Sequence, residues 1–176
     1  MTHIVVSPLS QLPLQVAHHH PSHIITLTSG DIPPLPGACK TERLCLSFHD
    51  IVEPRDGLVL ADADQMRQFL DFVQGWNRQA PLLIHCYAGV SRSPAAAYIA
   101  ALALDQQLDE KELAMKLRAL SPSATPNIRL VTLADQLLER QGRMVQAIRS
   151  IGRGADAFEG EVFSLPVSPD LKSCSA

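Results

Sequence analysis

The 176-residue chain is long enough for one domain with a hydrophobic core and too short for two domains of ordinary size. Its 46% hydrophobic and 19% charged residues are typical of a globular protein and exclude a wholly disordered chain. A formal net charge of −3 gives no support for a nucleic-acid-binding or membrane-adhesive surface, so an anionic substrate would have to be attracted by a local site.

Short apolar runs at residues 4–6, 24–27, 44–48 and 82–84 are predicted to be strands. They lack strict alternation of apolar and polar residues, which is typical of strands buried on both faces of a sheet. The segments between them are long and some have helical periodicity, as crossover connections between parallel strands require. We therefore predict an α/β fold with a central, mostly parallel sheet of about four strands flanked by helices.

The helical pattern predicts helices over residues 9–17, 62–79, 92–106, 109–120 and 128–151. Asp62 and Gln65 match a variant of the capping box at the start of the second helix, and Trp76 near its end is expected in the core. Gly142 lies inside the last pattern, which is therefore predicted to be one long helix or a broken one.

The composition changes near the C-terminus, where glycine, proline and serine become frequent. We predict a single domain over residues 1–152 and a tail over 153–176, partly ordered or docked. Little order is expected from Gly160 onward, although Phe158 and Phe163 could attach the tail to the domain.

The cysteines and the apolar pattern predict the cellular compartment. No stretch of about 18 apolar residues is present to span a membrane, and residues 1–6 do not resemble a signal peptide. Cys39, Cys45, Cys86 and Cys174 lack the paired spacing of a disulfide framework or zinc site. The sequence therefore predicts a cytoplasmic protein with no membrane partner, in which Cys39 or Cys45 is a minor candidate for a protective disulfide with Cys86.

Residues 85–93, His-Cys-Tyr-Ala-Gly-Val-Ser-Arg-Ser, join the fourth predicted strand to the following helix. A strand, a short loop and a helix start form an anion site, because backbone N–H groups converge there at the positive end of the helix dipole. The same groups favour the thiolate form of a cysteine, which is the nucleophile. Cys86 is therefore predicted to be a nucleophile at the floor of a phosphate-binding loop.

The other residues of this stretch suit the same chemistry. Gly89 allows a backbone whose amides all face the anion, and the planar guanidinium of Arg92 can bind two phosphate oxygens at once. His85 is expected to orient the loop by hydrogen bonds, and Ser93 to donate a hydrogen bond to the cysteine sulfur when it leaves. The predicted phosphate-binding residues are Cys86, Tyr87, Ala88, Gly89, Val90, Ser91 and Arg92.

This stretch matches every fixed position of the His-Cys-x-x-Gly-x-x-Arg-Ser/Thr signature of the protein tyrosine phosphatase superfamily, and residues 124–127 and 133–137 resemble the proline-asparagine segment of small dual-specificity phosphatases. The resemblance covers residues 1–150, is that of a compact bacterial member, and makes 1–152 the expected catalytic domain. It implies a two-step reaction without metal or cofactor, in which Cys86 forms a phosphocysteine and Arg92 binds the phosphate. Asn127 is interpreted as a structural support of the loop.

The leaving oxygen needs a proton, so the mechanism requires a carboxylic acid above the loop. The resemblance implies an aspartate on a loop that follows a buried strand, and Asp50 directly follows the strand predicted at 44–48. Asp50 is therefore our candidate for the general acid and, in the second step, the general base. Asp56 is the main rival and Glu53 a lesser one, because the direction of this loop cannot be inferred from the sequence.

The resemblance implies a phosphorylated protein or peptide as substrate, chiefly phosphotyrosine, with phosphoserine and phosphothreonine left open. Phosphate or sulfate is expected in the loop. The uncharged side chains at 87, 88, 90 and 91 argue against a polyphosphorylated inositol, and the acidic balance argues against a nucleic-acid partner. The alternatives are a phosphatase of small phosphate monoesters and a silent phosphate-binding module, whereas a sulfurtransferase fits the pattern poorly.

A run of histidines, His18 to His20 with His23 nearby, is a further motif that could bind a metal. No carboxylate or cysteine partner is evident in the sequence, so a solvated loop is the favoured interpretation and no metal site is predicted.

Overall fold

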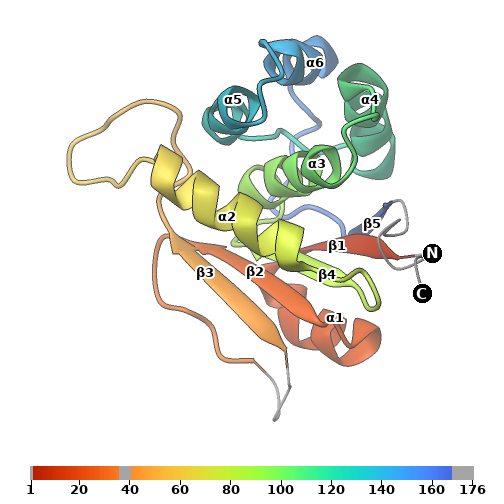
Figure 1. Ribbon diagram of the computed structural model, residues 1–176. Coiled ribbons are helices and arrows are strands. Elements are labelled where there is room, and N and C mark those ends of the chain that lie inside the picture. Colours follow the sequence, from red (N-terminus) through yellow and green to blue (C-terminus); the bar gives the residue numbers. More distant parts are fainter. Residues whose placement is uncertain (1, 36–40, 168–176) are drawn as a thin grey trace.

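A computed structural model describes residues 2–35 and 41–167, which form a five-stranded sheet with helices on both faces (Figure 1). The strands lie in the order β3-β2-β4-β1-β5 across the sheet. Their bounds are His3–Pro8 (β1), His23–Thr28 (β2), Glu42–Ser47 (β3), Leu82–Cys86 (β4) and Phe163–Pro166 (β5). The predicted α/β class is confirmed, and the four predicted strands correspond to β1 to β4.

The central strand is β4, which runs parallel to β2 on one side and to β1 on the other. All of its residues are buried, which explains the continuous apolar run that leads to His85 and Cys86. In its last pairs with its neighbours, Cys86 lies opposite Pro8 and His85 lies opposite Thr26. The carboxyl ends of three parallel strands therefore meet where β4 ends, which is where open α/β sheets bind ligands.

One helix covers one face of the sheet and the remaining helices cover the other (Figure 1). Each face has its own apolar cluster, the smaller one formed by β-strand residues with Leu12 and Val16 of the first helix. The helices are α1 (Leu12–His19, after a 3-10 turn at Leu9–Gln11), α2 (Ala63–Gly75), α3 (Arg92–Leu104), α4 (Glu110–Leu120), α5 (Ile128–Leu137) and α6 (Arg143–Ile151). No helix in these described ranges is long and apolar enough to cross a membrane.

The central helix of the larger layer is α3, which begins at Arg92 and is buried on all sides from Arg92 to Ala103. It is packed by α2, α4 and α5 as well as by the sheet (Figure 1). Its many alanines explain this position, because small side chains let several neighbours approach one helix closely. The helix that carries Arg92 is therefore held rigidly from all directions.

The start of α2 is as predicted. The Asp62 carboxylate accepts from the Gln65 N–H at 2.8 Å, and the Gln65 side chain accepts from the Asp62 N–H at 3.3 Å. The helix ends at Gly75, earlier than predicted, because the backbone of Trp76 is extended. This turns the indole into the core, where it is 1% exposed and donates from Nε1 to the Ala80 carbonyl at 2.8 Å.

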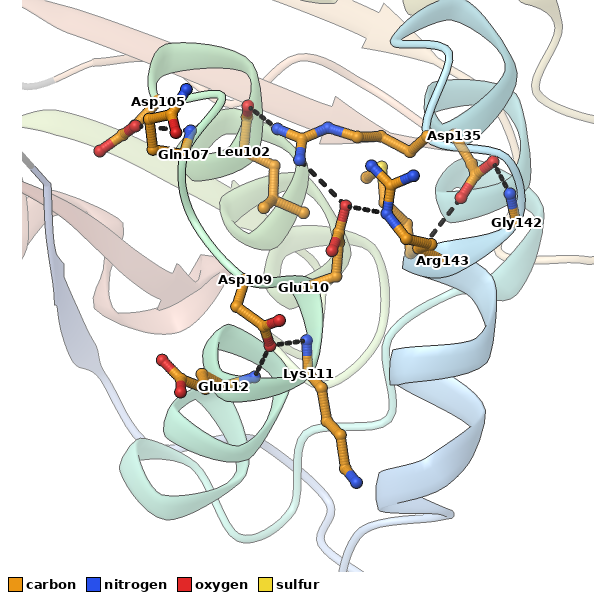
Figure 2. A network of polar contacts seen from close by, with 12 residues as sticks. Leu102, Asp105, Gln107, Asp109, Glu110, Lys111, Glu112, Asp135, Gly142 and Arg143 are labelled. Atoms are coloured by element: carbon orange, nitrogen blue, oxygen red, sulfur yellow. Dashed lines mark hydrogen bonds and ion pairs between the residues drawn. The ribbon is translucent and has the colours of Figure 1, made fainter.

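The predicted helix over 128–151 is broken into α5 and α6, as one of the two sequence interpretations allowed. Gly142 has a φ of 83°, a left-handed conformation that glycine adopts without strain. Asp135 joins the two helices, because its carboxylate accepts from the N–H groups of Gly142 at 2.6 Å and Met144 at 2.8 Å (Figure 2).

A buried ion pair connects α4 to the start of α6 and to α3 (Figure 2). The Glu110 carboxylate accepts from Arg140 at 2.9 Å and from Arg143 at 3.0 Å, and Arg140 also donates to the Leu102 carbonyl at 3.0 Å. The Glu110 and Arg140 side chains are each 8% exposed. Although burial acts to raise the pKa of Glu110, hydrogen bonds from its own backbone and from the two arginines lower it overall.

We predict that Glu110→Ala destabilises the protein, because it leaves Arg140 buried without its partner. The unfolding free energy should fall by about 3 kcal/mol, the usual cost of breaking a buried pair from one side. Urea denaturation measures the change, and Glu112→Ala, an exposed glutamate on the same helix, is the control. Equal stability of the two variants would contradict this role of the ion pair.

The C-terminal segment differs from the predicted tail of low order. Residues Phe163–Pro166 form β5, which pairs antiparallel with β1 at the edge of the sheet. Phe163 is 6% exposed and attaches this segment to the core, whereas Phe158 is 88% exposed and does not. The sequence did not reveal the strand because only two of its residues are buried and a proline ends it. Cys39 and Cys174 lie outside the described residues.

Candidate active site

Residues 85–93 run from the last two residues of β4 through a tight turn at 87–91 to the first two residues of α3, and residues 86–92 are called the cradle loop. Cys86 lies at its floor and is 4% exposed. Its Sγ lies 3.2 Å from Ser93 Oγ and 3.3 Å from the N–H of Gly89, which donates to it. The structure therefore places one backbone N–H and one hydroxyl group within hydrogen-bond distance of the sulfur.

Four carbonyl groups of the cradle loop are held by donors outside the loop. Each of these four accepts from a backbone N–H of another segment, and none of the peptide bonds in the described residues is cis. Because C=O and N–H point in opposite directions across a trans peptide, fixing these carbonyls outward directs the following N–H groups inward. The pairs are Leu9 N–H to Tyr87 O (3.0 Å), Gly160 to Ala88 (2.8 Å), Thr125 to Val90 (2.8 Å) and Asn127 to Ser91 (3.2 Å).

Gly89 is required at its position for two reasons. Its φ is +69°, in the left-handed region, and a Cβ built on it would lie 2.9 Å from the backbone nitrogen of Pro8. Side chains other than hydrogen would therefore be strained and would collide with the end of β1. This is the structural reason for the glycine of the sequence signature.

Arg92 is 5% exposed and extends beside the loop. One Nη donates to the carbonyl of Phe48 at 2.9 Å, and the buried Nε has no hydrogen-bond partner among the described residues. A buried donor without a partner costs free energy, which an anion bound in the loop would recover. The arrangement suits the phosphate-ligand role that the resemblance implies.

Asp50 is brought to the cradle loop. Its Oδ1 accepts from Ser91 Oγ at 2.8 Å and from Asn127 Nδ2 at 2.7 Å, and the same amide also donates to the Ile51 carbonyl at 3.3 Å. Asn127 therefore fixes both Asp50 and, through its own N–H, the Ser91 carbonyl. The rivals Glu53 and Asp56 are exposed farther along the loop between β3 and α2.

His85 precedes Cys86 in β4 and is 2% exposed. Its Nε2 is 2.8 Å from Thr26 Oγ1, which accepts from Arg43 Nε at 2.9 Å. Burial lowers the pKa of His85 to about 4, and the positive charges of Arg43 and Arg92 act in the same direction. Neither Thr26 nor Arg43 carries a motif that would have identified it in the sequence.

A pocket of about 400 Å³ opens beside Cys86 and Arg92. One wall is the segment after β2, which contributes Asp31 and Pro33, and Tyr87 and Leu9 are also among its lining residues. Arg43 donates to the Pro33 carbonyl at 2.8 Å, which ties this segment to β3. The pocket therefore combines the Cys86 thiol, a guanidinium and apolar surface. The remaining lining residues are Leu27, Thr28, Ser29, Gly30 and His85.

Two other sequence features are not part of this site. Cys45 of β3 pairs with Thr26 of β2, and β2 lies between β3 and β4. The backbone of Cys45 is therefore two strand spacings, roughly 9.5 Å, from that of β4. This exceeds the Cα separation of about 7 Å that a disulfide tolerates, so Cys45 cannot bond to Cys86 in this fold.

His18 and His19 stack at the end of α1, and no group of three potential ligands that could hold a metal occurs within 2–35 and 41–167.

Comparison with solved structures places this geometry in a known fold. The chain aligns with human DUSP28 at a TM-score of 0.59 and 16% identity, over 78% of this chain and 94% of that one. It aligns with the PTP-2 phosphatase of Cydia pomonella at 0.59 and 20% identity, over 76% and 84% of the two chains. The chain has the fold of the dual-specificity phosphatases.

The phosphatase fold is also found in a human tyrosine phosphatase-like serine/threonine/tyrosine-interacting protein, which aligns at a TM-score of 0.58 and 17% identity, over 80% of this chain and 97% of that one. No protein-family model matches the sequence, and no curated protein matches it significantly. At these identities the comparison establishes the fold, and the function has to be argued from the residues of the site.

We predict that His85 makes the phosphatase fold less stable in acid. The pKa of His85 is 6.5 when unfolded and about 4 when folded, so between these values only the unfolded chain binds the proton. The unfolding free energy therefore falls as the pH is lowered through this window, by about 3 kcal/mol at most. In His85→Gln this contribution is absent, and urea denaturation at pH 7 and pH 5 should show a smaller difference than in the wild type. An unchanged difference would contradict the assignment, since the other histidines are the same in both proteins.

Proposed function

We propose that the protein is a cysteine-dependent phosphatase that hydrolyses phosphotyrosine in proteins or peptides, with phosphoserine and phosphothreonine as further substrates. The observation that carries the proposal is the convergence on Cys86 Sγ of the Gly89 N–H and the Ser93 hydroxyl, beside the buried and unpaired Nε of Arg92. A sulfur in contact with an N–H donor and a hydroxyl group, with a guanidinium at the same pocket, suits a thiolate that attacks a bound phosphate.

In the first step the Cys86 thiolate attacks phosphorus, and a sulfur–phosphorus bond forms as the bond to the ester oxygen breaks. The inward N–H groups of the cradle loop and the Arg92 guanidinium stabilise charge on the three outer phosphate oxygens. The leaving oxygen takes a proton from Asp50. Both hydrogen bonds to this carboxyl end on Oδ1, which leaves Oδ2 for the proton transfer.

In the second step water attacks phosphorus, and the sulfur–phosphorus bond breaks. Asp50, now ionised, accepts the proton of the water, which returns it to its starting form. The sulfur leaves as a thiolate, and Ser93 Oγ at 3.2 Å is placed to donate a hydrogen bond to it. The products are inorganic phosphate and an enzyme ready for another cycle, with no cofactor consumed.

The substrate class follows from the surroundings of the loop. The loop side chains Tyr87, Ala88, Val90 and Ser91 are uncharged, which suits a single phosphate group. The adjoining pocket has apolar surface from Leu9, among other residues, against which an aromatic ring can pack.

A cysteine nucleophile must stay reduced, so the proposal places the protein in a reducing compartment such as the cytoplasm. A phosphatase of small phosphate monoesters remains the second candidate, because the pocket is open and polar on one side.

We predict that the wild type hydrolyses para-nitrophenyl phosphate in the presence of a chelator, and that Cys86→Ser loses activity by a factor on the order of 10³ or more. The variant keeps the N–H groups of the cradle loop, so it should still bind inorganic phosphate. Calorimetric titration with phosphate serves as the control. Full hydrolysis by Cys86→Ser would disprove the mechanism, and phosphate binding without any hydrolysis by the wild type would identify a silent binding module.

We predict that Asp50→Asn lowers kcat by a factor of roughly 10² to 10⁴, the usual contribution of a general acid. Asp56→Asn is the matched control, since Asp56 is an exposed aspartate on the same loop, and its kcat should be close to that of the wild type. The decisive measurement is kcat for para-nitrophenyl phosphate over a range of pH. Loss of kcat in Asp56→Asn, with Asp50→Asn near normal, would transfer the role to Asp56.

A further inference from the structure

The segment between α6 and β5 crosses the outside of the cradle loop, and residues 153–162 are called the C-terminal strap here. The N–H of Gly160 donates to the Ala88 carbonyl at 2.8 Å. Three further bonds attach the strap to the rest of the domain: the N–H of Gly154 to Thr125 Oγ1 at 3.0 Å, the N–H of Ala155 to the Pro122 carbonyl at 2.9 Å, and Ser10 Oγ to the carboxylate of Glu159 at 2.9 Å. The strap then continues into β5, which is fixed to the sheet by β1.

Gly160 contacts one peptide group of the loop, the one that joins Ala88 to Gly89. The Ala88 carbonyl oxygen of this peptide accepts from Gly160 outside the loop. The Gly89 N–H of the same peptide donates to Cys86 Sγ at 3.3 Å inside the loop. A trans peptide is planar and rigid, so the orientation of one end determines that of the other. If this peptide rotated by half a turn, the Ala88 oxygen would face the sulfur and the bound anion, where it would repel both.

The packing around this peptide leaves no room for a side chain. A Cβ built on Gly160 would lie 2.6 Å from the Gly89 oxygen and 3.1 Å from its carbonyl carbon. On the opposite side, a Cβ on Gly89 would lie 2.9 Å from the Pro8 nitrogen. Backbone from the end of β1 and backbone from the strap therefore enclose the loop at Gly89, and both approaches depend on glycine.

We propose that Gly160 is a positioning residue of the active site, which holds the Gly89 N–H on the Cys86 sulfur by binding the Ala88 carbonyl from outside. The C-terminal strap is thereby part of the machinery that prepares the nucleophile and the anion site. This role rests on the proposed function, but it concerns the thiol and the anion site themselves, and both can be measured without turnover.

The test compares two changes at Gly160 with a control. Gly160→Ala inserts a methyl group against the Gly89 carbonyl. A semisynthetic protein with glycolate in place of Gly160 replaces the N–H by an ester oxygen and adds no steric bulk, so it tests the hydrogen bond even if Gly160→Ala fails to fold. Gly142→Ala is the control, because it strains a left-handed glycine in open space at the start of α6.

Three assays are made. The first measures the rate of Cys86 alkylation by iodoacetamide at pH 6, the second the affinity for inorganic phosphate, and the third kcat and KM for para-nitrophenyl phosphate. We expect the ester and Gly160→Ala to lower alkylation and phosphate affinity by about tenfold each, because the Gly89 N–H is then no longer held toward the sulfur and the anion. We expect kcat to fall as well, and Gly142→Ala to match the wild type in all three. Wild-type alkylation and phosphate affinity in the ester would overturn the proposal, as would equal losses in Gly142→Ala. Absence of hydrolysis in the wild type would disprove the proposed function alone, because the first two measurements would still test the strap.

Discussion

The arrangement of the site depends on one constraint, the planarity of the trans peptide bonds in the cradle loop. An anion site built from backbone N–H groups needs several consecutive peptides to point the same way, which an isolated loop would not maintain because its carbonyls would compete for the same space. Here four of the loop carbonyls accept from donors outside the loop, which favours the inward direction of the N–H groups that follow them. The donors come from Leu9, Thr125, Asn127 and Gly160, which lie far apart in the sequence.

This constraint explains why a small catalytic loop needs most of the domain. The end of β1 supplies Leu9 and the close contact of Pro8, the segment before α5 supplies Thr125 and Asn127, and the C-terminal strap supplies Gly160. Asn127 has a second role, because its side chain binds Asp50, the proposed proton donor, and fixes its position relative to the loop. The buried helix α3 and the ion pair of Glu110 hold the helical layer from which these segments extend (Figure 2).

The parts of this account that could be predicted from the sequence are those with local signals. The apolar runs predicted β1 to β4, the capping residues predicted the start of α2, and the signature placed Cys86 and Arg92 at a strand-to-helix turn. The C-terminal strand and Gly160 could not be predicted, because their contribution is made by backbone groups and depends on contacts across the whole fold. The same holds for Arg43 and Thr26, whose effect on His85 arises only when β2, β3 and β4 lie side by side.

The fold comparison and the site geometry support different parts of the conclusion. The similarity to human DUSP28 identifies the scaffold, whereas the contacts at Cys86, Asp50 and Arg92 support the chemistry. The most direct test of the central claim is a crystal structure of the protein with tungstate bound, the anion being located by anomalous scattering. The account predicts tungstate in the cradle loop, with its oxygens on the backbone N–H groups and on Arg92, and the four carbonyls still on their outer donors. Tungstate bound elsewhere, or a loop carbonyl turned toward it, would contradict the account.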